Sequence, residues 1–135
     1  MKIDKNNYFL KDSLEYFSHN KDERISFVKN KNFLFTEISN FLNNCISSSQ
    51  KVIFFCCGNS IISKHINSEN KYVHEIDDNY NKKLLDEDEY KNLNGDYENI
   101  IDQVDCVVIA DIEHQKNPAK NLKQISQNIN DEARI

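Results

Sequence analysis

One stretch, Lys51–Ser60, constrains the fold of this chain more than any other. It opens with a short apolar run over residues 52–57 and ends abruptly in turn-prone residues over 58–60. A second apolar pair, Ile61-Ile62, follows at once. This order predicts a buried strand that runs into a tight loop and then a helix. In open α/β sheets, ligands bind just beyond the carboxyl ends of such strands, so the remaining chain is interpreted around this turn.

Length and composition indicate one globular domain. The chain has 135 residues, of which 39% are apolar and 29% charged, a balance typical of a protein with a modest core. The longest apolar runs hold about six residues, far fewer than a membrane span needs, and residues 1–7 lack the apolar core of a secretion signal. These features predict a cytoplasmic protein. The net charge of −5 and the scattered lysines argue against nucleic acid as a partner.

The four cysteines are Cys45, Cys56, Cys57 and Cys106. They form no C-x-x-C pair, so their spacing predicts no metal site. A disulfide between the adjacent Cys56 and Cys57 would be strained. All four lie among apolar residues and are expected to be small buried hydrophobes.

The rest of the chain alternates between helix and strand patterns. Residues 1–20 show no clear periodicity and are expected to form a loose arm. Apolar residues recur at helical spacing over 34–45 and predict a helix with one wide apolar stripe. Further elements are expected as follows: strands at 52–56, 71–76, 90–96 and 104–110, short helices at 61–66 and 80–85, a helix beginning at Asn117-Pro118, and the first residues of another strand at 133–135. The alternation predicts a parallel sheet flanked by helices.

Acidic residues close two of the expected strands. Asp77 ends the second strand, where a carboxylate commonly accepts hydrogen bonds from ribose hydroxyls. Asp96 ends the third strand and could accept from an adenine amino group. Together with the loop after the first strand, these positions predict a pocket for an adenosine-containing ligand. Simpler roles stay open: Asp77 as a helix cap, Asp96 as a turn residue, and Gly58 as a residue that permits positive φ.

These segments resemble class I S-adenosylmethionine-dependent methyltransferases over about residues 20–135. Residues 52–60 stand where that family has an acidic, glycine-rich first motif. Residues 72–77 resemble the motif that ends in the ribose-binding acid, and residues 94–97 resemble the adenine-binding acid and its neighbour. Residues 104–114 resemble the fourth strand and its acid-Glu-His tail. Among relatives, the chain is most similar to methyltransferase domains fused to glycosyltransferases.

The resemblance implies an α/β fold with a Rossmann-like parallel sheet. Residues 1–50 would form an N-terminal arm and helical lead-in, and residues 51–135 an incomplete domain truncated at about the fifth strand. The implied cofactor is S-adenosyl-L-methionine, with its methionine part near the first loop, its ribose on the second strand and its adenine near the third. The implied cofactor-binding residues are Cys56, Cys57, Gly58, Asn59, Asp77, Asp96, Tyr97 and Ala110.

The implied reaction is an in-line attack on the sulfonium methyl group, to which the protein contributes proximity and alignment. Asp111 or His114 would face the methyl acceptor, and the ordinary pKa of histidine suits a general base. The acceptor would be a small molecule, a sugar or a lipid-linked compound.

Departures from the family pattern keep other interpretations open. Phe54 replaces the acid of the first motif, and Cys56 and Ser60 replace two of its glycines. These changes favour a degenerate fold that acts as a non-catalytic binding module. A nicotinamide-dinucleotide domain is a second alternative, but it needs a G-x-G-x-x-G turn and only Gly58 is present there. A truncated sheet also predicts a homodimer through an exposed strand edge.

Overall fold

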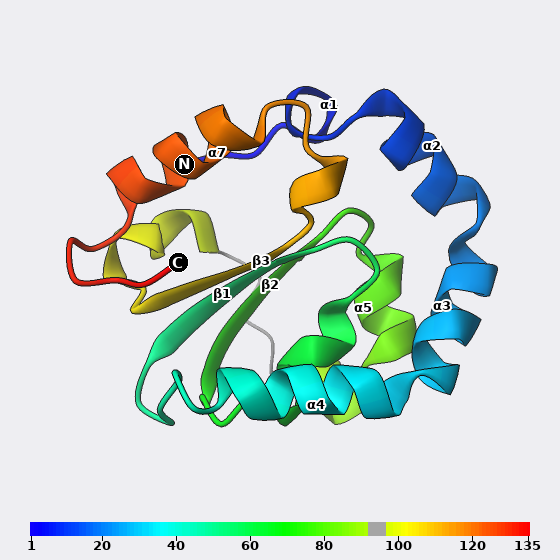
Figure 1. The fold of residues 1–135 in the computed structure, drawn as a ribbon, viewed down its shortest axis with the longest axis horizontal. Helices are drawn as coiled ribbons and strands as arrows, with labels where there is room; N and C mark the ends of the chain where they lie inside the picture. Colours follow the sequence, from blue (N-terminus) through cyan, green and yellow to red (C-terminus); the bar gives the residue numbers. More distant parts are fainter. Residues whose placement is uncertain (92–96) are drawn as a thin grey trace.

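A computed structural model describes residues 1–91 and 97–135. Within these residues, strands β1 (Lys51–Cys56), β2 (Asn70–Glu75) and β3 (Cys106–Ala110) form a parallel sheet in the order β2-β1-β3, with helices around it (Figure 1). The α-helices are α1 (Lys5–Tyr8), α2 (Lys11–His19), α3 (Lys21–Asn30), α4 (Asn32–Leu42), α5 (Asn79–Leu84), α6 (Glu87–Lys91) and α7 (Pro118–Asn128), and the 3₁₀ helices are η1 (Ser60–His65), η2 (Tyr97–Asn99), η3 (Ile101–Gln103) and η4 (Ile112–His114). No helix in the described part of the chain is both long and apolar enough to cross a bilayer.

Strand β1 is central because it is apolar on both faces. Its side chains alternate across the sheet. Val52, Phe54 and Cys56 join the core cluster that contains residues of α4, η1 and α5, whereas Ile53 and Phe55 join the cluster shared with β3 and α7. All five side chains are fully buried. The sequence-based prediction of a parallel sheet flanked by helices is therefore confirmed.

The strand register brings the three carboxyl ends to one edge of the sheet. Cys56, the last residue of β1, lies opposite Glu75 of β2 and Ala110 of β3. Because all the pairings are parallel, the segments that follow the three strands emerge together. This edge, which we call the strand-tip edge, is where the sequence predicts a ligand.

The expectation of a loose arm over residues 1–20 is wrong. Asp4 caps α1 by accepting from the Asn6 amide, and α2 follows directly. Phe9 and Phe17 are buried in the core, and the Phe9 ring stacks on His74 of β2 with centroids 6.3 Å apart. Phe9 thus contacts β2, whereas Phe17 stands edge-on to Tyr80 of α5 and His114 of η4. These contacts with elements distant in the chain order the segment.

The apolar stripe predicted over 34–45 does lie on a helix, α4, but it is buried only in part: Ile38 and Leu42 pack against the core cluster. Phe35 is buried, but Leu34 and Phe41 are exposed, as is Cys45 beyond the helix end. Ser39 is buried instead, and its hydroxyl donates to a carbonyl in its own helix at 2.8 Å and to one in η1 at 2.7 Å. Because α4 packs on the short η1, only a narrow face of the helix is covered.

The expected strand at 90–96 is wrong where the structure describes it. Tyr90 and Lys91 belong to α6, and the other residues of that strand lie outside the described residues. The helix begins with a reciprocal capping box: the Glu89 amide donates to Asp86 Oδ1, and the Asp86 amide donates to Glu89 Oε2, both at 2.9 Å. The four consecutive acidic residues 86–89 therefore start a helix.

The start of α7 follows the sequence-based expectation, whereas the described structure has a single bridge and no strand at 133–135. Asn117 caps α7 by accepting from a first-turn amide at 3.0 Å, and Pro118 occupies the first turn. Arg134 then lies beside β3 in a single parallel bridge. Its carbonyl accepts from the Val107 amide at 2.8 Å, and its amide donates to the Asp105 carbonyl at 3.0 Å. These two bonds occupy part of the outer edge of β3.

Candidate functional site

The loop after β1 folds around a carboxylate from the neighbouring strand. Glu75 Oε2 accepts from the amides of Gly58 at 2.8 Å and Ile76 at 3.2 Å. Glu75 Oε1 accepts from the amides of Asn59 at 3.1 Å and Ser60 at 2.9 Å. The side chain is deeply buried, with the residue only 4% exposed. The loop in which the sequence predicts a ligand is thus organised by the chain's own carboxylate.

The strand register explains how Glu75 reaches this loop. Glu75 lies beside Cys56, so its side chain stands next to the turn that begins one residue later. Burial raises the pKa of Glu75 to about 7, although hydrogen bonds from the loop amides lower it. No acidic side chain stands in β1, and the carboxylate that accepts from the loop comes from β2. Sequence reasoning missed this role, although a charged residue in a buried strand is itself a signal, because such groups need polar partners.

Side chains from α3 and α5 close the loop from outside. Gly58 has a φ of +66°, which favours glycine, so it does occupy a positive-φ turn. A Cβ at this position would lie 3.1 Å from Arg24 Cγ and 3.2 Å from Tyr80 Cε1. The Arg24 guanidinium also donates to the Asn59 side-chain oxygen. The loop has no open space directly above its glycine.

Cys56 and Cys57, both predicted to contact the cofactor, are buried. Burial raises the pKa of both thiols, and the nearby carboxylates of Glu75 and Asp111 raise it further. Neutral thiols of this kind behave as small hydrophobes and not as nucleophiles. Cys106 is buried as well, so the expectation of buried cysteines fails only for Cys45.

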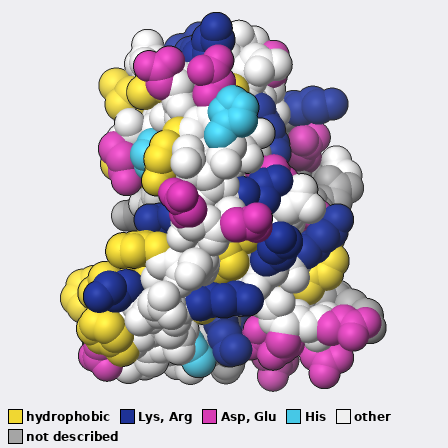
Figure 2. All heavy atoms as spheres, turned by 90° about the vertical axis from the view of Figure 1, so that its right-hand side faces the viewer, with side chains coloured by type: hydrophobic (Ala, Val, Ile, Leu, Met, Phe, Trp, Pro, Cys, Tyr) yellow, Lys and Arg dark blue, Asp and Glu magenta, His cyan; other side chains and the backbone are white. Residues whose placement is uncertain are grey.

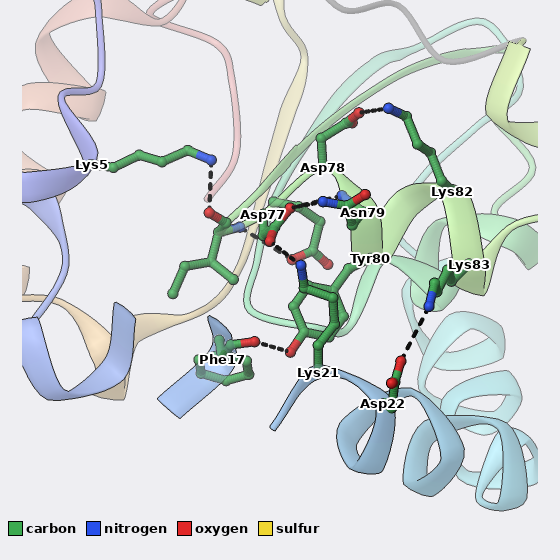
Figure 3. Close-up of polar contacts among 12 residues, drawn as sticks. Lys5, Phe17, Lys21, Asp22, Asp77, Asp78, Asn79, Tyr80, Lys82 and Lys83 are labelled. Atoms are coloured by element: carbon green, nitrogen blue, oxygen red, sulfur yellow. Dashed lines mark hydrogen bonds and ion pairs between the residues drawn. The ribbon is translucent and has the colours of Figure 1, made fainter. Parts of the chain in front are cut away.

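Asp77 follows β2 at the strand-tip edge and is already paired (Figure 3). Its Oδ2 lies 2.6 Å from Lys21 Nζ of α3. Its Oδ1 accepts from the amide of Asn79 at 2.9 Å and from that residue's side-chain nitrogen at 2.8 Å. Partial burial raises the pKa of Asp77, but the bonds from Lys21 and Asn79 outweigh this effect and hold it at about 2. Asp77 is therefore an ionised carboxylate that supports the turn into α5.

Asp111, one of the two predicted catalytic residues, is fully buried. Its Oδ1 accepts from Gln115 Nε2 at 2.6 Å, and that amide nitrogen also donates to the Tyr8 hydroxyl at 2.8 Å. Asn121 of α7 donates to the Gln115 side-chain oxygen at 3.0 Å. Burial raises the pKa of Asp111 to about 6, against hydrogen bonds from Gln115 and Tyr8 that lower it. These contacts place Asp111 in a polar network that joins β3, α1 and α7.

His114, the other predicted catalytic residue, faces α2. Its Nδ1 lies 3.2 Å from the Ser13 hydroxyl, and its ring stands edge-on to Phe17 with centroids 5.0 Å apart. Its Nε2 lies 3.5 Å from a carboxylate oxygen of Glu113. The imidazole and Asp111 thus point to different partners, one in α2 and the other in α1 and α7.

Three predicted cofactor residues remain, and the structure does not describe all of them. Ala110, at the end of β3, lies opposite Cys56 and is partly buried. Asp96 lies outside the described residues. For Tyr97 only the backbone is described, at the start of η2.

Helices α1 to α3 contact the segments that follow all three strands, and in Figure 1 they curve around that end of the sheet. Lys5 Nζ donates to the Ile76 carbonyl after β2 at 2.7 Å. The Tyr80 hydroxyl of α5 donates to the Phe17 carbonyl of α2 at 2.8 Å (Figure 3). In addition, Lys21 pairs with Asp77, Arg24 donates to Asn59, and Ser13 lies within hydrogen-bond distance of His114. Helices α1 to α3 therefore cover the strand tips, and we call these three helices the N-terminal cover.

Two polar pockets lie away from the strand-tip loops. One, of about 630 Å³, is lined by residues that include Lys64, Asn70, Lys71 and Glu89. Another, of about 280 Å³, lies between the N-terminus and α7, beside Asn117. Among the described residues, no group of three histidine, cysteine or acidic side chains is arranged to hold a metal ion.

Comparison with known proteins identifies no relative: no protein-family model, curated protein or solved structure matches this chain.

Proposed function

We propose that this chain is a degenerate methyltransferase-like fold that acts as a non-catalytic binding module. The observation that carries the proposal is the Glu75 carboxylate inside the loop after β1. Loop amides at such a turn are the groups that would hold an anionic part of a ligand. Here they donate to an internal carboxylate, so a cofactor would have to displace a buried side chain that is fully hydrogen-bonded.

The other ligand positions support the same proposal. A ribose on Asp77 would have to replace Lys21, which lies 2.6 Å from its carboxylate. A methyl acceptor at Asp111 would have to reach a side chain with no solvent exposure. A nicotinamide dinucleotide meets the same obstacle as the adenosyl cofactor, because its pyrophosphate would need the amides that Glu75 holds.

A second candidate function is S-adenosylmethionine-dependent methyl transfer to a small-molecule, sugar or lipid-linked acceptor. The ionised state and partial exposure of Asp77 favour it, because such a carboxylate can accept from ribose hydroxyls once Lys21 moves away. In this candidate the acceptor atom would bond to the methyl carbon while the carbon–sulfur bond breaks and leaves a neutral thioether. His114 would take the acceptor's proton.

Calorimetric titration with S-adenosylhomocysteine separates the two candidates. The proposal expects no saturable heat and no shift in melting temperature, with NAD giving the same result. Saturable binding that is lost in Asp77→Ala but kept in Asp78→Ala would overturn it. Asp78 is a matched control because it is the adjacent carboxylate and pairs with Lys82 at 3.3 Å, outside the predicted ribose contact.

A further inference from the structure

Helices α3 and α4 meet at a corner that exposes large apolar side chains. Phe27 of α3 is 47% exposed, and Phe33 and Leu34 at the start of α4 are 67% and 47% exposed. Phe41, further along α4, is 69% exposed. Scattered exposed apolar residues are ordinary, but several within two consecutive helices form a surface that water solvates poorly.

The same segment is basic in an acidic protein. Residues 21–42, which span α3 and α4, carry four basic and three acidic side chains, so their net charge is +1. Since the whole chain carries −5, the remainder carries −6. Lys29 and Lys31 are both exposed. Figure 2 shows a hydrophobic cluster at the lower left with both basic and acidic side chains beside it, and Figure 1 shows α4 along the bottom of the molecule.

We propose that this corner, where the exposed Lys29 and Lys31 adjoin Phe33 and Leu34, binds the surface of an anionic lipid bilayer. Aromatic and aliphatic side chains enter the boundary between headgroups and acyl chains, while lysines keep their ammonium groups at the level of the anionic headgroups. The acidic remainder of the molecule is repelled by such a surface. The charge distribution therefore orients the protein with its basic corner toward the lipid.

A second copy of this chain fits the corner less well than an anionic bilayer does. In a two-fold symmetric contact the same patch would face itself. Lys29 and Lys31 of one copy would then approach the same lysines of the other, and like charges brought together across an interface oppose association. An anionic bilayer removes this repulsion, because it supplies the opposite charge over an extended plane.

Vesicle sedimentation of the full chain tests the proposal. The probes are vesicles of equal parts phosphatidylcholine and phosphatidylglycerol, compared with pure phosphatidylcholine vesicles. We expect partition into the anionic vesicles at low salt, weakened at high salt. Lys29→Gln/Lys31→Gln should lower the partition coefficient roughly thirty-fold, at about 1 kcal/mol per basic residue near the surface. Phe33→Ser should lower it roughly ten-fold through lost apolar burial.

Matched variants elsewhere provide the controls. Lys11→Gln/Lys123→Gln removes the same charge from α2 and α7, and Ile135→Ser removes another exposed apolar side chain. These variants should bind anionic vesicles as the wild type does. Three outcomes would overturn the proposal: no partition into anionic vesicles, equal loss in the control variants, or association of the chain with itself in place of vesicle binding.

Discussion

At the residue scale, Glu75 explains why the strand-tip loop has its shape. A buried carboxylate is costly unless polar groups surround it. The three consecutive amides after Cys57, together with the Ile76 amide, supply those groups. The same bonds satisfy backbone donors that a sharp turn would otherwise leave without partners. The carboxylate and the loop therefore stabilise each other, whatever the module binds.

The stability that Glu75 contributes should depend on pH. Its pKa rises from an ordinary 4.5 to about 7 on folding. Between these two pH values the folded state therefore keeps a proton that the unfolded chain has lost. This contribution is fully present below pH 4.5 and is lost as the pH rises through about 7. Glu75→Gln lacks it. The unfolding free energy of the wild type minus that of the variant should thus fall by on the order of 3 kcal/mol across this window.

Urea denaturation of both proteins at a series of pH values measures this difference. His74 and Asp111 also titrate on folding, but they are present in both proteins and their contributions cancel in the comparison. A difference that stays constant between about pH 4 and pH 8 would contradict the assigned environment of Glu75.

Gly58→Ala should destabilise the fold by about 2 kcal/mol, as judged by urea denaturation. The left-handed backbone accounts for part of this cost, and contact of the new Cβ with Arg24 and Tyr80 accounts for the rest. In an Arg24→Ala background the contact with Arg24 disappears while the backbone cost remains. The same substitution should therefore cost less there, and an equal cost in both backgrounds would show that Arg24 does not crowd the loop.

At the scale of elements, the N-terminal cover decides which groups remain accessible at the strand tips. Helices α2 and α3 contribute Ser13, Lys21 and Arg24, each of which bonds to a segment that follows a strand. Most of these bonds are single polar contacts near the surface, which contribute little stability individually. The buried hydroxyl of Tyr80 on the Phe17 carbonyl is the exception.

Tyr80→Phe should loosen α2 more than the rest of the fold. The change leaves the buried Phe17 carbonyl without its donor, at a cost of about 1–3 kcal/mol. Hydrogen exchange should show faster exchange in α2 than in α7. Tyr16→Phe, on an exposed side chain, is the control and should leave both helices unchanged. Equal acceleration in α2 and α7 would mean that the bond stabilises the whole fold and not the cover specifically.

At the scale of the whole molecule, the N-terminal helices and the sheet share one core. Phe17, Ile25, Val28 and Phe35 join the same cluster as Val52 of the central strand. The helical lead-in is therefore part of the sheet's packing. On the other side of the molecule, the outer edge of β3 is partly occupied by the segment around Arg134.

Arg134→Pro should increase self-association. The sequence predicts a homodimer through an exposed strand edge, and Arg134 lies beside the edge of β3. Proline cannot donate to the Asp105 carbonyl, so the edge of β3 loses a backbone partner. Light scattering over a concentration series should show a higher mean mass than for the wild type. Arg134→Ala keeps the backbone donor and should behave as the wild type does. Equal masses for all three proteins would contradict a role for this edge in association.

Much of the sheet could be predicted from local pattern, because its signals are local. The apolar run in β1 and the Asn117-Pro118 start of α7 each reflect burial or capping within a few residues. The order of residues 1–20 could not be predicted in this way, since Phe9 and Phe17 are held by residues distant in the chain. The apolar stripe expected over 34–45 is buried only in part for a related reason. An apolar spacing marks a face that can be buried, but not how much of a neighbour will cover it.

The sequence by itself determined that this chain forms a parallel α/β sheet with a tight glycine loop after its central strand. Strand burial and turn formation both depend on the types of residues that are neighbours in the chain. Only the tertiary structure decided what fills that loop. Glu75 reaches it from another strand, and Lys21 and Arg24 arrive from helices far earlier in the chain. Such matches of charge and hydrogen bonding depend on strand register and helix packing, which bring together residues that no short-range pattern relates.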